Sequence, residues 1–305
     1  SASRIVADMD RTLFTPVPIK ITKDGQWHLP DLSLSPDLSL NKLSSNLAPV
    51  TFTSADLTSN VVKPQILTGW QNCFAVAFPI IHGPGGEDGS LQGLLELAGI
   101  PYVGSGILAS ALGMDKDYAR RLVTQQGMNS VPYLVISNHQ WQHDASLVVA
   151  NIQASFRPSW FVKPANLGSS IGITKVVTPT QLPSAIELAF TYTNKVLVEP
   201  AITPLIELEV CVLESLSGPT PIVSMVGQVE HHDEYYTYAA KYAPGGAEIL
   251  IPAPLDPQLA QQVQHLAGNI FTTLGAAGMA RVDFFLNPDT GAIYFNAVSY
   301  THLRA

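Results

Sequence analysis

The sequence predicts an α/β domain followed by two α+β lobes, and three observations indicate this fold class. An apolar run over residues 74–81 leads into a glycine-rich turn and then into a helical pattern from Ser90, the order expected of an open α/β sheet. From about residue 131 the pattern changes to apolar segments of strand length. Near the end, an amphipathic helix over residues 257–274 precedes two more strand patterns.

The first domain is expected to occupy residues 1–113. Its elements follow from apolar runs and from the glycines, prolines and serines that end them. We expect, in order, a helix, a strand (17–21) and a tight turn (Asp24-Gly25) within residues 1–29, a surface loop over the repeated segments 30–34 and 36–40, a parallel strand buried on both faces (74–81), and a helix from Ser90 that stops at Gly99.

The two lobes are expected to span residues 114–200 and 201–305. Asp115 can cap the first helix of this part and Gly127 can end it. The remaining predictions are strands at 131–136, 160–163, 196–199, 206–213 and 222–229, a helix at 185–192, the long helix at 257–274, and strands at 279–286 and 292–295.

Composition and charge exclude several classes of protein. The 305 residues carry a net charge of −8, which argues against nucleic-acid binding. No apolar stretch is long enough to cross a bilayer, so we expect no membrane partner. Cys73 and Cys211 lie in apolar runs and predict buried free thiols of a reducing compartment. Because no signal-peptide pattern is present either, we expect a cytoplasmic location.

The segment from Phe161 to Gly172 predicts a phosphate site. A strand-like run ends with Lys163, and a turn rich in glycine and serine follows. Such a turn can point several backbone N–H groups at one anion, while the lysine adds a positive charge. The segment lacks both the Walker A ending and the spacing of a dinucleotide-binding turn. Taken alone, it equally fits a surface hairpin with an exposed lysine.

Several motifs, in this order and spacing, together resemble the D-alanine–D-alanine ligases of the ATP-grasp superfamily over about residues 1–296. The motifs are His82-Gly83-x-x-Gly86-Glu87-Asp88-Gly89-x-Leu91-Gln92-Gly93, Gly104-Ser105-Gly106 with Met114-Asp115-Lys116, Lys163-Pro164 with Gly168-Ser169-Ser170, Ala240-Lys241-Tyr242, and Arg281-Val282-Asp283-Phe284-Phe285. The resemblance implies an N-terminal open α/β domain and two α+β lobes that clasp ATP. It also implies the ATP-dependent ligation of two D-alanines through an acyl phosphate, for peptidoglycan precursors of the bacterial cell wall.

On this resemblance, residues of both lobes bind ATP. Lys116 and Lys163 would contact the phosphates, because a transferring phosphoryl group needs positive charge on its oxygens. Glu199 would meet the adenine, Glu207 would hold the ribose, and two phenylalanines would sandwich the base, although core packing predicts the same phenylalanines. The implied ATP-binding residues are Lys116, Phe161, Lys163, Glu199, Ile202, Glu207, Lys241 and Phe285.

The resemblance also implies catalytic, substrate and metal residues. Ser169 and Tyr242 would belong to the closing lid, and His82 would reach the first D-alanine. Arg281 would stabilise charge on the acyl phosphate, and Asp283 would bind Mg²⁺ or Mn²⁺. If Arg281 and Asp283 are treated as adjacent strand positions, their side chains are expected to point to opposite faces of the sheet. A twist of the strand, or a position at its end, would then be needed to bring both side chains to the site. The alternatives are a surface ion pair between these two and a plain turn histidine at 82.

The chain departs from the family pattern in the lid and near its end. Thr237 and Ala239 replace acidic lid residues, while Ala297 and Ser299 stand where the family has a Glu-x-Asn pair. We expect residues 297–305 to be foreign to the protein, the chain to be truncated at both ends, and the chain as written to be inactive.

Two alternatives to a D-alanine ligase therefore stay open. One is a nucleotide-binding relative without catalysis, and the other is an ATP-grasp ligase of a different acid and amine. Tyr242 favours D-alanine over D-lactate as second substrate, since relatives that use D-lactate lack this tyrosine. Because dimers are common among these ligases, a homodimer is one expected assembly.

Overall fold

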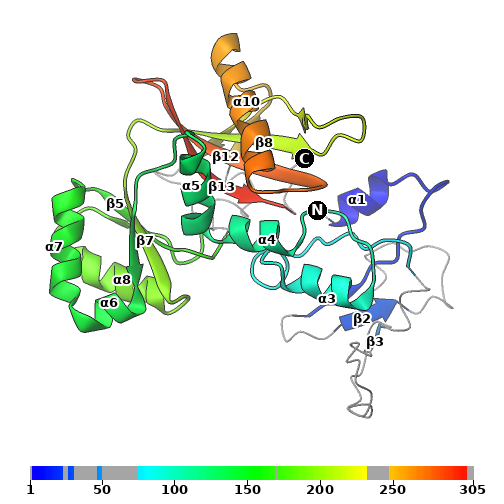
Figure 1. The fold of residues 1–305 in the computed structure, drawn as a ribbon, viewed down its shortest axis with the longest axis horizontal. Helices are drawn as coiled ribbons and strands as arrows, with labels where there is room; N and C mark the ends of the chain where they lie inside the picture. Colours follow the sequence, from blue (N-terminus) through cyan, green and yellow to red (C-terminus); the bar gives the residue numbers. More distant parts are fainter. Residues whose placement is uncertain are drawn as a thin grey trace. The chain divides into compact units, whose positions relative to one another are not determined.

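The computed structural model describes residues 2–22, 27–30, 47–49, 74–168, 170–231 and 247–300 (Figure 1). The chain divides into two compact units. The first comprises Ser1–Ile80, Leu94–Tyr102 and Arg304–Ala305, and the second comprises Ile81–Gly93 and Val103–Leu303. The predicted domain boundaries after residues 113 and 200 stay predictions. Within the described ranges, no helix is both long and apolar enough to span a bilayer.

The first unit contains a helix and a small antiparallel sheet with the strand order β1-β2-β3. Its elements are α1 (Ala2–Asp8), β1 (Lys20–Ile21), β2 (Trp27–Pro30) and β3 (Leu47–Pro49). The prediction of a fully buried strand over residues 74–81 is wrong. A single parallel bridge joins Ala77 to Tyr102. Val76 and Phe78 are 42% and 38% exposed, so the run is not covered on both faces.

The helices between residues 81 and 127 are α3 (Ser90–Ala98), α4 (Ile107–Met114) and α5 (Lys116–Gln125). Of these, α3 and α5 end just before the predicted stop glycines. Gly99 and Gly127 follow α3 and α5 with φ of 68° and 79°, which glycine adopts without a Cβ clash. The Asp115 side chain accepts the first free N–H groups of α5, as predicted. The backbone N–H of Lys116 also donates to the Ala165 carbonyl at 2.9 Å, which anchors the start of α5.

The second unit contains two sheets, of which the first is four-stranded and antiparallel, in the order β4-β7-β5-β6. Its strands are β4 (Leu134–Ser137), β5 (Trp160–Pro164), β6 (Thr174–Val176) and β7 (Lys195–Pro200), with helices α6 (Asn138–His143), α7 (Ala145–Ser155) and α8 (Leu182–Phe190). Side chains such as Trp160, Val162 and Val198 face the helices and form one core with Ile186. The opposite face therefore carries Phe161 and its alternate neighbours.

The sequence patterns missed α6 and α7. The α6 segment is short and polar, so apolar periodicity does not reveal it. Its local signal is a capping box, in which Ser137 and Gln140 exchange hydrogen bonds between side chain and backbone.

The second sheet of this unit has the order β11-β10-β8-β12-β13, with β9 paired to β8. Its strands are β8 (Ile206–Leu213), β9 (Ile222–Val223), β10 (Gly227–His231), β11 (Ala247–Leu250), β12 (Met279–Asn287) and β13 (Ala292–Ser299), and α10 (Pro257–Thr273) lies against it (Figure 1). The prediction of one strand over residues 222–229 is wrong. The Ser224 hydroxyl accepts the Cys211 N–H at 3.0 Å in place of a carbonyl, and the ladder stops there.

A β-bulge interrupts the pairing of β12 with β13. Asp283 pairs with Ala297 and Phe284 pairs with Phe295, which leaves Asn296 as the extra residue. Beyond the bulge, Ser299 lies opposite Arg281. The pairing thus continues four residues past the predicted end of this strand, and it brings Ala297 and Ser299 beside the predicted site residues of β12.

Candidate active site

One face of β5 and β7 carries the first group of predicted site residues. Phe161 pairs with Glu199 and Lys163 pairs with Leu197, so Phe161, Lys163 and Glu199 point to the same side. Lys163 is 6% exposed and Glu199 is 1% exposed. An ion pair joins Lys163 Nζ to Glu199 Oε1. The alternative of a surface hairpin with an exposed lysine is therefore wrong.

Glu199 has a second cationic partner, Arg120, which the sequence analysis missed. Arg120 Nη1 lies 2.7 Å from Glu199 Oε2, and the Arg120 side chain is fully buried. Its Nε and Nη2 donate to the Asn296 carbonyl at 3.3 and 3.2 Å, and Nη2 also donates to Asn296 Oδ1 at 3.2 Å. Burial lowers the pKa of Arg120 to about 10, so the group stays charged at pH 7. Its position four residues after Lys116, on the same helix face, was the available signal.

The second group of predicted residues lies on β12. Arg281, Asp283 and Phe285 alternate along the strand and share one face. The expectation that Arg281 and Asp283 point apart is wrong, because they are two residues apart and not adjacent. Arg281 Nε and Nη2 donate to the two oxygens of Asp283 at 2.7 and 2.8 Å. Because Arg281 is buried, this is not the alternative surface pair.

Two glutamates of β8 lie beside β12. Glu207 pairs with Phe285, and Glu209 pairs with Asp283. Glu209 Oε1 also lies 3.4 Å from Arg281 Nη2. Burial opposes the charged guanidinium, but Asp283 and then Glu209 outweigh it and raise the pKa of Arg281 above its ordinary value. Arg281 is therefore a permanent cation held between two carboxylates.

The two groups meet at the Lys163 ammonium. Lys163 Nζ lies 5.6 Å from the ring centroid of Phe161 and 5.6 Å from that of Phe285, within cation–π distance of both. One ring comes from β5 and the other from β12. Lys116 Nζ donates to the Leu167 carbonyl, in the turn that follows β5. The structure thus brings together predicted residues that lie more than a hundred positions apart in the sequence.

The structure says less about the position of several other predicted site residues. Ile202 is half-buried in the segment after β7, three residues beyond Glu199. Ser169, Lys241 and Tyr242 lie outside the described residues, as do Cys73, the turn at Asp24-Gly25, the loop over 31–40, and Thr237 with Ala239 of the predicted lid.

His82 begins a turn that β13 reaches from the other end of the chain. Glu87 Oε2 accepts the Gly83 N–H at 2.7 Å, and Glu87 Oε1 accepts a hydrogen bond from Ser299 Oγ at 2.5 Å. Burial lowers the pKa of His82 below 6.5, although the negative charge of Glu87 opposes this shift. The histidine is therefore neutral at pH 7, which suits a hydrogen-bonding role.

This shift in the pKa of His82 predicts an effect of pH on stability. The unfolded chain binds a proton at His82 more readily than the folded chain does, so acid favours unfolding. We expect the free energy of unfolding to fall as the pH drops below about 6.5, the ordinary histidine value. Urea unfolding between pH 8 and pH 5 should show a smaller fall for His82→Gln than for wild type. The exposed His143→Gln is the control, and equal slopes for all three proteins would contradict the prediction.

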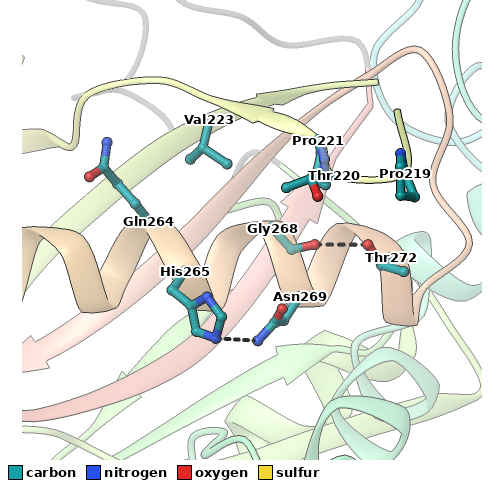
Figure 2. A pocket seen from close by; sticks show the side chains of 9 residues that line it. All are labelled: Pro219, Thr220, Pro221, Val223, Gln264, His265, Gly268, Asn269 and Thr272. Carbon is teal, nitrogen blue, oxygen red and sulfur yellow. Dashed lines mark hydrogen bonds between the residues drawn. The ribbon is translucent and has the colours of Figure 1, made fainter. Parts of the chain in front are cut away.

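A cavity of about 340 Å³ lies between α10 and the segment before β9 (Figure 2). It is lined by Pro219, Thr220, Pro221, Val223, Gln264, His265, Gly268, Asn269 and Thr272. His265 Nε2 and Asn269 Nδ2 lie 3.1 Å apart, and the Gln264 side chain donates to the Ser224 carbonyl at 2.7 Å. No predicted site residue is among its lining residues, so the cavity is separate from the site on β5, β7 and β12.

Comparisons with known proteins find relatives over nearly the whole chain. The family model described as "D-ala D-ala ligase N-terminus" matches residues 1–105, and "D-ala D-ala ligase C-terminus" matches residues 122–301. The chain is 38% identical to D-alanine--D-alanine ligase of Caldicellulosiruptor bescii over 300 residues, covering 98% of this chain and 80% of that protein. It is 40% identical to D-alanine--D-alanine ligase A of Bradyrhizobium diazoefficiens over 309 residues, covering 98% and 81%.

Solved structures show the same likeness. The VanG D-Ala:D-Ser ligase from Enterococcus faecalis superposes with a TM-score of 0.79 at 32% identity, over 98% of this chain and 84% of that one. The D-alanine-D-alanine ligase from Coxiella burnetii gives a TM-score of 0.75 at 29% identity, over 98% and 80%.

Proposed function

The chain belongs to the D-alanine–D-alanine ligase family, and on this premise we propose that it joins two D-alanines at the expense of ATP, through an acyl phosphate, for peptidoglycan synthesis. The observation that carries the proposal is the buried Lys163 ammonium, flanked by the rings of Phe161 and Phe285 and paired with Glu199. Two aromatic rings suit a nucleotide base, and a buried lysine suits its phosphates.

ATP would be held between the two sheets of the second unit. Lys163 and Lys116 would contact the phosphates, since both lysines are anchored by neighbouring residues and can offer a charge at a fixed place. The proposed ATP residues are Lys116, Phe161, Lys163, Glu199, Ile202, Glu207, Lys241 and Phe285. Arg281 would stabilise negative charge on the acyl phosphate, and the neutral His82 would contact the first D-alanine. Ser169 and Tyr242 would contribute from the lid.

We assign the magnesium ion to Asp283. Mg²⁺ at phosphoryl-transfer sites usually takes one or two carboxylates and completes its shell with phosphate oxygens and water. Asp283 and the neighbouring Glu209 are oxygen donors of this kind, whereas Ala297, opposite Asp283, supplies no ligand. Among the residues with described positions, no group of three or more histidine, cysteine or acidic side chains could hold a metal. Asp283 and Glu209 therefore fit an ion that also takes ligands from ATP. When bound, this ion would neutralise charge on the phosphates.

Ala297 also supports a second candidate function, nucleotide binding without ligation, which is the behaviour that the sequence analysis expects of the chain as written. The two candidates separate in one experiment on the chain with ATP and Mg²⁺. Calorimetry should detect ATP binding for both. Phosphate release that depends on D-alanine, with D-alanyl-D-alanine as product, is expected only of the ligase, and L-alanine is the control. ATP binding without such release would favour the second candidate, and absence of ATP binding would contradict both.

Location and assembly are proposals of the same kind. We propose a cytoplasmic protein, because ATP is available there, and a homodimer. Sedimentation equilibrium of the purified chain at several concentrations measures its mass in solution and would test the assembly, because a dimer has twice the 32.7 kDa mass of one chain.

A further inference from the structure

Glu199 shares its carboxylate between two cations on different elements. Oε2 pairs with Arg120 Nη1 of α5 at 2.7 Å, and Oε1 pairs with Lys163 Nζ of β5. All three side chains are buried. The two cations differ in their other contacts. Lys163 Nζ lies 5.6 Å from the ring centroids of Phe161 and Phe285, whereas Arg120 donates to Asn296 and lies 5.4 Å from the ring centroid of Tyr133.

This arrangement has a consequence for any phosphate bound by Lys163. A buried carboxylate that loses its counter-ion is costly, because neither water nor a partner then compensates its charge. If Lys163 were the sole cation of Glu199, turning the ammonium toward a phosphate would leave Glu199 uncompensated. With Arg120 in place, Glu199 keeps a partner at its other oxygen.

The guanidinium of Arg120 is suited to stay where it is. Its planar fork places Nη1 on Glu199 while Nε and Nη2 donate to the carbonyl and side chain of Asn296. A lysine at this position would carry the charge but not the fork, so it could not keep all of these contacts. Arg120 thus ties α5 to β7 and to the bulge of β13.

We propose that Arg120 is a positioning residue for the nucleotide: it serves as the permanent counter-ion of Glu199 and thereby releases Lys163 to bind a phosphate of ATP. This inference rests on the proposed ATP site. A purely structural role for Arg120 would lower stability and would leave the contribution of Lys163 to ATP affinity unchanged.

The test is a double-mutant cycle on ATP affinity, measured by calorimetry with Mg²⁺ on the full chain. Lys163→Met and Arg120→Met should each raise the dissociation constant roughly tenfold or more, the size expected for a lost charged contact. The double variant should bind no more weakly than Lys163→Met alone, because the lysine contact through which Arg120 is inferred to act is absent from both. Arg120→Lys keeps the charge and should recover most of the affinity, although its melting temperature falls. Arg121→Met, an exposed charge on the same helix, should bind ATP like wild type.

Each other outcome has a distinct meaning. Wild-type affinity in Arg120→Met, or losses that multiply in the double variant, would overturn the inference while leaving the ATP site intact. If Arg120→Met does not fold, Arg120→Gln replaces it in the same cycle, because glutamine keeps a donor near Asn296 without the charge. Failure of wild type itself to bind ATP would contradict the proposed function instead.

Discussion

Replacing Lys163 by methionine is expected to weaken ATP binding by about 1.5–3 kcal/mol, which is roughly 10- to 150-fold in the dissociation constant. The reason is the loss of a charge-assisted contact in a site shielded from water, where the ammonium lies 5.6 Å from two aromatic ring centroids. Arg120 remains beside Glu199 in the variant, so the fold should persist. Lys116→Met should have an effect of similar size on ATP binding.

Calorimetric titration with ATP and Mg²⁺ measures this effect, and thermal melting checks the fold. Arg157→Met is the matched control, because it removes one positive charge from an exposed loop just before β5. Wild-type affinity in Lys163→Met would show that the segment from Phe161 to Gly172 does not bind phosphate. An equal loss in Arg157→Met would show that only net charge matters.

Truncating Phe284 or Phe285 to alanine is expected to separate stability from binding. These neighbours on β12 point to opposite faces. Phe284 is buried in the core under α10, so Phe284→Ala should lower the free energy of unfolding by about 3–5 kcal/mol. Phe285 is half-buried beside Lys163, so Phe285→Ala should lose less stability but should bind ATP more weakly.

Urea unfolding of the two variants measures their loss of stability, and titration of the same variants with ATP measures their loss of affinity. Each variant serves as the control of the other, since both remove the same atoms from adjacent positions. A larger stability loss for Phe285→Ala, or unchanged ATP affinity in that variant, would contradict the assignment of the two faces of β12.

Local signals in the sequence were sufficient for several element boundaries. The cap at Asp115, the stops at Gly99 and Gly127, and the bounds of β8 depend on neighbours along the chain, and the structure confirms them. The structure also brings the predicted residues Lys163, Glu199 and Phe285 together, while their roles at an ATP site stay a prediction. These features are readable because caps, stops and alternating patterns act over a few residues.

Tertiary structure decided what depends on partners far along the chain. The only sequence signal for Arg120 is its spacing from Lys116, and folding alone brings it to Glu199 and Asn296, 79 and 176 residues away. The bulge at Asn296 sets which residues of β13 face Asp283. The apolar run at 74–81 has the pattern of a strand, but in the structure it forms only a single bridge, at Ala77. The sequence by itself therefore determined the family, and it supplied most of the residues of the proposed site. Packing of α5 beside β5 and β7 determined which charges share Glu199 as a partner, because that depends on three-dimensional contacts that periodicity does not encode.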